Sequence, residues 1–133
     1  GERIIFTGHF QRQKLGVVYA SADIFAFPSL TDTQGLVLHE AAGAGLPMVM
    51  CDAHVSEIFH NNSNGLLAAN EPEDFAEKIM EILSDTETTR SMGKKSKEYA
   101  TEHTEEKQIK DLEALYTRCI KNHKKIQFAG GEW

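Results

Sequence analysis

The feature that most constrains this chain is the alternation of short apolar runs with amphipathic stretches. Short runs closed by Gly, Pro or polar residues are typical of buried strands; they lie at 3–7, 23–27, 46–51 and 66–69. Residues 13–22 and 35–43 instead repeat apolar side chains at three- and four-residue steps, which predicts helices. Strands that alternate with helices favour parallel pairing through right-handed crossovers. The expected fold class is therefore α/β, a Rossmann-like layered parallel sheet flanked by helices.

The second half of the chain is predicted to be mostly helical. A short helix is expected at 56–60, followed by a turn at 61–65. Residues 70–72 then open a helix whose apolar face carries Phe75, Ile79, Ile82 and Leu83. Further helices are predicted at 87–101 and 104–124, and 127–133 is expected to be a disordered tail.

Length and strand number suggest an incomplete version of a familiar domain. A chain of 133 residues fits one compact domain, 1–133. About four strands are fewer than a doubly wound domain usually has. Because the chain opens directly at an apolar run, we expect that N-terminal βα units precede it in the whole protein.

Composition excludes several classes of function. The net charge of -6 argues against a nucleic-acid partner, because such binding depends on clustered Lys and Arg. The apolar runs are too short to cross a bilayer, and no signal-peptide pattern is present, so a cytoplasmic location is expected. Cys51 and Cys119 lack metal-ligand spacing and are predicted to be packing residues of a reducing compartment.

The most informative segment runs from Pro28 to Pro47. It places a polar loop after one predicted strand, starts a helix at Gly35, and ends at the next strand, where open parallel sheets bind ligands. The free N–H groups of 33–37 (Thr33, Gln34, Gly35, Leu36 and Val37) and the positive helix end suit a phosphate or sugar hydroxyls. Gly35 allows close approach to that backbone.

Two acidic residues, Asp32 and Glu40, flank this helix start with seven residues between them. The first lies in the loop and the second in the second helical turn, so both are expected to face one crevice. A carboxylate accepts two hydrogen bonds side by side and therefore suits a vicinal diol such as ribose. Charge-assisted bonds of this kind contribute about 1.5 to 3 kcal/mol each.

At these residues the sequence resembles the GT-B glycosyltransferases of glycosyltransferase family 4, also called glycosyl transferases group 1. The resemblance covers nearly the whole chain, at Phe6-Thr7-Gly8, Ala22-Asp23, Pro28-Ser29, Gly35, Glu40-Ala41, Gly45-Leu46-Pro47 and Asn64-Gly65. The amino-acid sequence of residues 33–38 is most similar to the corresponding segment of bacterial members that glycosylate membrane lipids. The chain would then be the C-terminal, donor-binding domain of such an enzyme.

The resemblance implies roles for individual residues. Glu40 would hold the ribose hydroxyls, and Asp32 would face the donor sugar near its 3-hydroxyl. The amides around Gln34, Gly35 and Leu36 would hold the sugar and the distal phosphate, and the turn Gly8, His9, Phe10 would lie near the base. The family usually has Glu at the position of Asp32, whose shorter side chain implies a deeper sugar or a water-mediated contact.

The implied reaction is metal-independent transfer of a hexose with retention of its anomeric configuration. The donor would be UDP-glucose or, second, GDP-mannose, with no further cofactor. The acceptor, a lipid or glycan, and the catalytic partner would belong to the N-terminal domain. The basic residues that grip the diphosphate would also lie upstream. We therefore expect this chain alone to bind donor weakly and to transfer nothing.

Two other functions remain open on the same residues. One is a nucleotide-sugar epimerase or hydrolase of the same fold, and the other is a non-catalytic nucleotide-binding module. The basic run Lys94, Lys95 and Lys97 is interpreted as a solvated helix face, with peripheral contact to anionic lipid as the alternative. His39 is predicted to pack or face solvent, and Glu57 to cap a helix or join the site.

Overall fold

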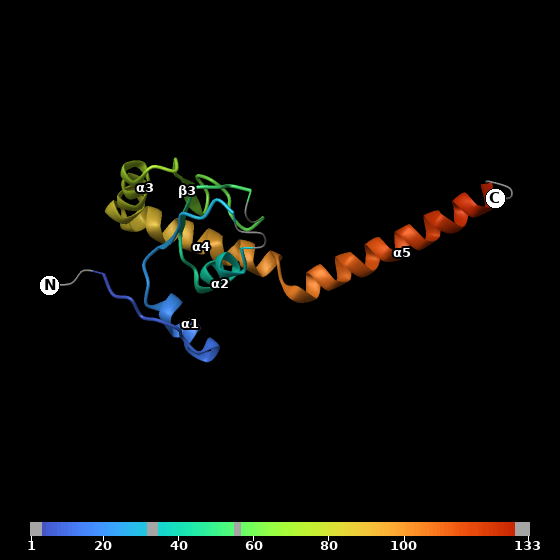
Figure 1. Cartoon of the computed structure of the whole chain (residues 1–133), viewed down its shortest axis with the longest axis horizontal. Helices are drawn as coiled ribbons and strands as arrows, with labels where there is room; N and C mark the ends of the chain where they lie inside the picture. Colours follow the sequence, from blue (N-terminus) through green and yellow to red (C-terminus); the bar gives the residue numbers. More distant parts are fainter. Residues whose placement is uncertain (1–3, 32–34, 55–56, 130–133) are drawn as a thin grey trace. The chain divides into compact units, whose positions relative to one another are not determined.

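A computed structural model describes residues 4–31, 35–54 and 57–129. The chain divides into two compact units, Gly1–Thr101 and Glu102–Trp133. The first unit contains a sheet and four helices within its described residues, and the second contains one helix (Figure 1). The order is α1 (Arg12–Ala20), β1 (Phe25–Phe27), α2 (Leu36–Ala44), β2 (Met48–Met50), β3 (Gly65–Leu67), α3 (Pro72–Ser84), α4 (Thr86–Glu102) and α5 (Glu105–Ala129).

The strands of the described residues form one parallel sheet in the order β1-β2-β3. Phe25 pairs with Met48 and Met48 pairs with Gly65, so the three strands start level with one another. All carboxyl ends therefore lie at one edge of the sheet and all amino ends at the other. This confirms the predicted parallel α/β arrangement.

The two faces of the sheet carry separate apolar clusters because strand side chains alternate in direction. On one face, Met48 and Met50 pack with Leu38 and Ala42 of α2. On the other, Val49 and Leu66 pack with Ile82 of α3, and Phe75 and Ile79 join them from the same helix. The sheet is thus a middle layer between helices.

Helix α4 runs along the amino edge of the sheet and touches both clusters. Met92 packs against the α3 cluster, whereas Tyr99 packs against the α2 cluster. Between them, the buried Ser96 hydroxyl donates a 2.7 Å hydrogen bond to the Leu46 carbonyl, just before β2. A Cβ on Gly93 would lie 2.4 Å from the Gly45 oxygen, so the backbones approach more closely than any side chain allows.

The start of β3 is held by Asn64 and Gly65. The fully buried Asn64 side chain donates a 2.8 Å hydrogen bond to the Ile58 carbonyl and accepts one of 2.8 Å from the His60 N–H. A Cβ on Gly65 would lie 2.1 Å from the Met48 oxygen, so only glycine fits between β3 and β2. The predicted turn at 61–65 is therefore also a packing element.

The predicted strand at 3–7 is not formed by its described residues, 4–7. Ile4, Ile5 and Phe6 are exposed by 73%, 80% and 95%. An apolar run becomes a strand only where a neighbouring strand supplies hydrogen-bond partners. Within the described residues the sheet has three strands rather than about four, and none of them reaches this run.

Two other boundaries differ from the predictions. Glu57 and Ile58 form a turn rather than a helix, while 55–56 lie outside the described residues. Helix α5 continues to Ala129, so 127–129 are helical instead of belonging to a tail. The sequence offers no glycine or proline before Gly130 that would end the helix earlier.

In the described residues of the second unit, the helix is α5, which follows Thr104. The Thr104 carbonyl accepts the Gln108 N–H at 3.0 Å and so closes the first turn. The helix exposes a set of large apolar side chains, namely Ile109, Leu112, Leu115, Tyr116 and Ile120. Cys119 is exposed as well, which does not match its predicted packing role. Among the described residues, no helix combines the length and apolar character needed to span a bilayer.

Candidate functional site

The carboxyl edge of the sheet gathers the loops that follow the three strands. These loops are 28–31 after β1, 51–54 after β2 and 68–71 after β3, in the described residues. Helices α2 and α3 follow the first and third strands, so each begins near this edge. Open parallel sheets bind their ligands here.

Helix α2 begins at a glycine that adopts a conformation other residues rarely take. Gly35 has φ 54° and ψ 37° in the left-handed region, and its carbonyl accepts the Leu38 N–H at 2.8 Å. The first N–H groups of a helix have no partner within the helix. No acidic side chain occupies the first turn, so α2 itself does not neutralise its positive end. The predicted helix start is confirmed.

Glu40 lies in the second turn of α2 with its side chain exposed. Its Oε2 accepts a 3.0 Å hydrogen bond from the hydroxyl of Tyr19, on α1. Within the described part of the chain, Tyr19 is the hydrogen-bond partner of Glu40. The bond fixes one oxygen of the carboxylate, Oε2.

The environment of Tyr19 keeps its hydroxyl protonated. Burial is the largest cause, and the hydrogen bond and negative charge of Glu40 add to it, so the pKa of Tyr19 rises to about 12. The ring also packs against Phe25 of β1, with 6.0 Å between ring centroids. At neutral pH the Tyr19 hydroxyl is protonated and donates to Glu40.

A cavity of 340 Å³ opens at the same edge. Pro28, Cys51 and Asn70 follow the three strands and line it together with the start of α3, which contributes Glu71, Pro72 and Phe75. The Cys51 thiol donates to the Ala69 carbonyl at 3.6 Å. Burial, followed by the charge of Asp74, raises the pKa of this thiol, so it stays protonated. Cys51 is half-buried, in agreement with its predicted packing role.

The predicted site residues are described unevenly. Gly35, Leu36, Val37 and Glu40 share one helix start, whereas Asp32, Thr33 and Gln34 lie outside the described residues. Gly8 has φ 67°, His9 is exposed and Phe10 is half-buried, in a segment without regular structure. Within the described part of the chain, no hydrogen bond joins this segment to α2. Its place near a base stays a prediction, as do the roles of Asp32 and Glu40.

Sequence reasoning missed Tyr19 as a site residue. Tyr19 belongs to the apolar positions of the predicted helix 13–22, and its ring is partly buried against Phe25. The usable signal was the hydroxyl, because a partly buried tyrosine normally finds a hydrogen-bond partner. His39 is half-buried on α2. Glu57 lies exposed in a turn, next to residues 55–56, which are outside the described part of the chain.

A parallel sheet with a glycine-started helix at its carboxyl edge defines a Rossmann-like domain of the GT-B type. Its likeness to a sucrose-phosphate synthase structure from Thermosynechococcus elongatus supports this class, with a TM-score of 0.81 and 26% identity over 92% of this chain. The family model of glycosyl transferases group 1 matches residues 1–85. The chain therefore belongs to the glycosyl transferases group 1 family.

Two curated relatives show the range of this similarity. The sulfoquinovosyl transferase SQD2 of Arabidopsis thaliana is 36% identical over 74% of this chain. The alpha-monoglucosyldiacylglycerol synthase of Acholeplasma laidlawii is 28% identical over 90% of it. The chain spans only 20% and 30% of these proteins and 31% of the sucrose-phosphate synthase chain.

Proposed function

We propose that this chain is the donor-binding part of a retaining glycosyltransferase that moves a hexose from a nucleoside-diphosphate sugar to a lipid or glycan. The observation that carries the proposal is Glu40, held by Tyr19 in the second turn of a helix that starts at Gly35. The family membership supports the same class of reaction.

Glu40 and the start of α2 are each proposed to bind one part of the nucleoside-diphosphate sugar. The oriented Glu40 carboxylate accepts hydrogen bonds from the two ribose hydroxyls. The N–H groups at the start of α2 and the positive helix end receive the distal phosphate. During transfer the bond between the anomeric carbon and the diphosphate oxygen breaks, and the diphosphate leaves with the electron pair. The acceptor hydroxyl oxygen forms the new bond to the anomeric carbon, and its proton passes to the departing diphosphate. Negative charge then develops where the helix start stabilises it.

The acceptor is proposed to be a lipid or glycan held by a further domain. The name of one relative, the alpha-monoglucosyldiacylglycerol synthase, refers to a diacylglycerol lipid and therefore favours a membrane lipid. Such a protein would work at the cytoplasmic face of a membrane, where a peripheral contact suffices. UDP-glucose is the first proposed donor and GDP-mannose the second.

Titration of the isotope-labelled chain with UDP, GDP and ADP, followed by NMR, tests this proposal. We expect the largest shifts at the amides of Gly35, Leu36 and Val37, and a clear preference for one base. Shifts spread evenly over the chain, or none with any nucleotide, would contradict the donor site.

The alternative functions differ in their products. The whole protein, incubated with donor and acceptor, is expected to give a glycosylated acceptor. Free sugar would instead indicate a hydrolase and an isomerised donor an epimerase, while binding without any turnover would indicate a nucleotide-binding module. This chain alone is expected to give none of these products, and robust transfer by it would contradict the proposed division of labour.

A further inference from the structure

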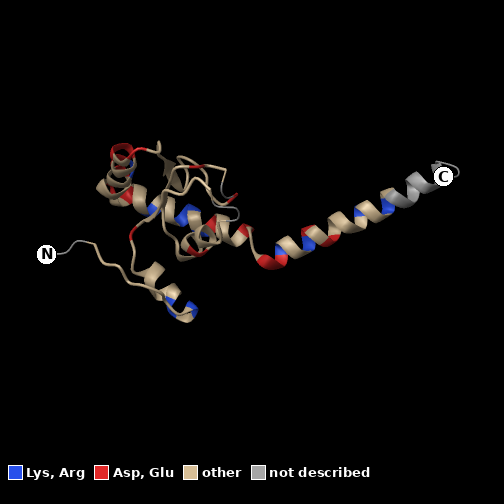
Figure 2. Ribbon diagram, viewed as in Figure 1, with Lys and Arg blue, Asp and Glu red and all other residues tan. Residues whose placement is uncertain are grey.

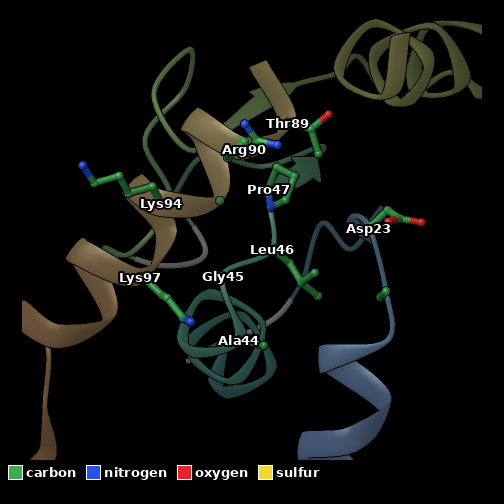
Figure 3. A pocket seen from close by; sticks show the side chains of 11 residues that line it. Asp23, Ala44, Gly45, Leu46, Pro47, Thr89, Arg90, Lys94 and Lys97 are labelled. Atoms are coloured by element: carbon green, nitrogen blue, oxygen red, sulfur yellow. The ribbon is translucent and has the colours of Figure 1, made fainter. Parts of the chain in front are cut away.

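A second cavity lies at the opposite, amino edge of the sheet. It has a volume of 420 Å³ and is lined by the residues before β1 (Ala22 and Asp23), the end of α2 with the residues before β2 (Ala44 to Pro47), and α4 (Thr89, Arg90, Gly93, Lys94 and Lys97). We call this cavity the α4 pocket. Figure 3 shows α4 on one side of it and Asp23 on the other.

The α4 pocket is positively charged although the whole chain carries a net charge of -6. Arg90, Lys94 and Lys97 share one face of α4 because they are four and three residues apart. Figure 2 shows Lys and Arg in blue along the chain, α4 included. Among the described residues, none of the three forms an ion pair with a carboxylate. Lys95 pairs with Glu98 at 2.6 Å, and Lys94 also lies within electrostatic range of that carboxylate.

The part of α4 that carries the basic side chains is packed tightly against the segment before β2. Gly93 meets the Gly45 backbone directly, and the Ser96 hydroxyl binds the Leu46 carbonyl. The Lys97 stem crosses Gly45, with its Cδ and Cε atoms 3.4 Å from the place of a Cβ there. In Figure 3 the Lys97 and Arg90 side chains flank the segment from Gly45 to Pro47, while the Lys94 ammonium turns outward. Arg90 and Lys97 are thus the inner pair.

Local opposing charges are fewer than the cations. Asp23 is the carboxylate that lines the pocket. Helices α1 and α2 end beside it, and each carboxyl end carries about half a negative charge. Arg90, Lys94 and Lys97 outnumber Asp23 in the lining, so the pocket has a local excess of positive charge, which the helix ends and the interaction of Lys94 with Glu98 reduce. A phosphate monoester, which carries about -1.5 to -2 charges at neutral pH, is complementary to such a lining.

We propose that the α4 pocket binds a phosphate group, with Arg90 and Lys97 as its main contacts. Arginine offers a planar fork of donors that suits phosphate oxygens, and lysine adds a point charge. The phosphate can come from a small soluble ester or from the headgroup of an anionic lipid. The pocket lies at the opposite edge from Glu40, so this site is separate from the proposed donor site.

NMR titration of the labelled chain with inorganic phosphate at constant ionic strength tests the proposal. The amides of Gly45, Gly93 and Lys97 report the α4 pocket, while those of Gly35 and Leu36 report the donor site. We expect saturable shifts of the first set that chloride does not reproduce. In Arg90→Gln/Lys97→Gln, phosphate should bind there at least about tenfold more weakly, because two charge-assisted contacts are lost.

Two control variants isolate the cause. Arg12→Gln/Lys14→Gln removes the same two residue types from exposed positions on α1 and should leave the shifts unchanged. Arg90→Lys/Lys97→Arg keeps both charges and should retain most of the affinity, which excludes a folding defect. Equal affinity in the parent and in Arg90→Gln/Lys97→Gln would overturn the proposal. A lower melting temperature with no phosphate effect would overturn it too, because the cations would then only stabilise the end of α2.

Vesicles identify the source of the phosphate. Phosphatidylcholine vesicles with and without phosphatidic acid are sedimented with the parent chain and with Arg90→Gln/Lys97→Gln. If the parent chain sediments only with the vesicles that contain phosphatidic acid, and Arg90→Gln/Lys97→Gln does not, the phosphate belongs to a lipid headgroup. Saturable phosphate shifts without such sedimentation assign a soluble ester. If neither vesicles nor free phosphate engages the three reporter amides, the α4 pocket is no phosphate site.

Discussion

The two edges of the sheet differ in what their glycines do. At the amino edge, Gly65 and Gly93 let backbone meet backbone, and buried Asn64 and Ser96 bond to carbonyls there. At the carboxyl edge, Gly35 starts a helix whose next residue, Leu36, and whose Glu40 are exposed. At the amino edge these residues close the contacts between α4, β2 and β3, whereas the start of α2 at the carboxyl edge is exposed. Substitutions of the packed residues should therefore change stability, and those at the start of α2 should change nucleotide binding.

The strongest way to break this comparison is Gly65→Ala. The new Cβ would lie 2.1 Å from the Met48 oxygen, so β3 must move away from β2. We expect the free energy of unfolding to fall by about 3 kcal/mol, measured by urea denaturation. Gly43→Ala is the matched control, because nothing lies within 4 Å of its Cβ and the residue is inside α2. It should gain about 0.5 to 1 kcal/mol, and an equal loss in both variants would refute the packing argument.

The next largest effect is expected at the carboxyl edge, from Glu40→Ala. Loss of the ribose hydrogen bonds should weaken binding of the preferred nucleoside diphosphate by about 2 to 3 kcal/mol, measured by calorimetry. Stability should hardly change, because the side chain is exposed. Glu77→Ala removes an exposed carboxylate from α3 and serves as the control. Unchanged affinity in Glu40→Ala would show that the ribose site was misassigned.

Ser96→Ala tests the contribution of a buried hydrogen bond at the amino edge of the sheet. Its hydroxyl is buried and gives the Leu46 carbonyl a 2.7 Å hydrogen bond. We expect a loss of about 1 to 2 kcal/mol of unfolding free energy with unchanged nucleotide affinity. Thr101→Ala removes an exposed hydroxyl that bonds only within α4, and it should cost less. A binding defect in Ser96→Ala would mean that the two edges are coupled.

Tyr19→Phe tests how much the orientation of the Glu40 carboxylate contributes to nucleotide affinity. The carboxylate keeps its charge but loses the donor that fixes Oε2. Nucleotide affinity should fall by about 0.5 to 1.5 kcal/mol, less than in Glu40→Ala. The double variant Tyr19→Phe/Glu40→Ala should bind no worse than Glu40→Ala alone, since Tyr19 acts through Glu40. Additive losses would show that Tyr19 has its own contact with the ligand.

The smallest effect is a pH dependence of stability. The folded-state pKa of Tyr19 is about 12, against an ordinary value of 10.0. Because the folded state holds this proton more tightly, its stabilising effect is complete below about pH 10 and is lost as the pH rises toward about 12. Denaturation across this range should show a decline that Tyr19→Phe reduces. An identical decline in both proteins would assign it to other groups.

The sequence predicted those parts of the molecule whose partners lie nearby in the chain. Helices α1 to α4 and strands β1 to β3 follow apolar periodicity, and the Gly35 start and the end at Gly45 follow glycine chemistry. The prediction of a strand at 3–7 was wrong for its described residues, because a strand needs a neighbouring strand and the periodicity of the sequence does not show whether one is present. The bond between Tyr19 and Glu40 joins α1 to α2, and the α4 pocket joins three distant segments. Such juxtapositions follow from the crossovers rather than from any local pattern.

The path of α4 has a consequence for how the first unit unfolds. Met92 belongs to the cluster on one face of the sheet and Tyr99 to the cluster on the other. Neither layer can therefore melt alone, because release of α4 uncovers both at once. We expect amide hydrogens from β2 and from the middle of α4 to exchange with the same free energy, as members of a single cooperative unit.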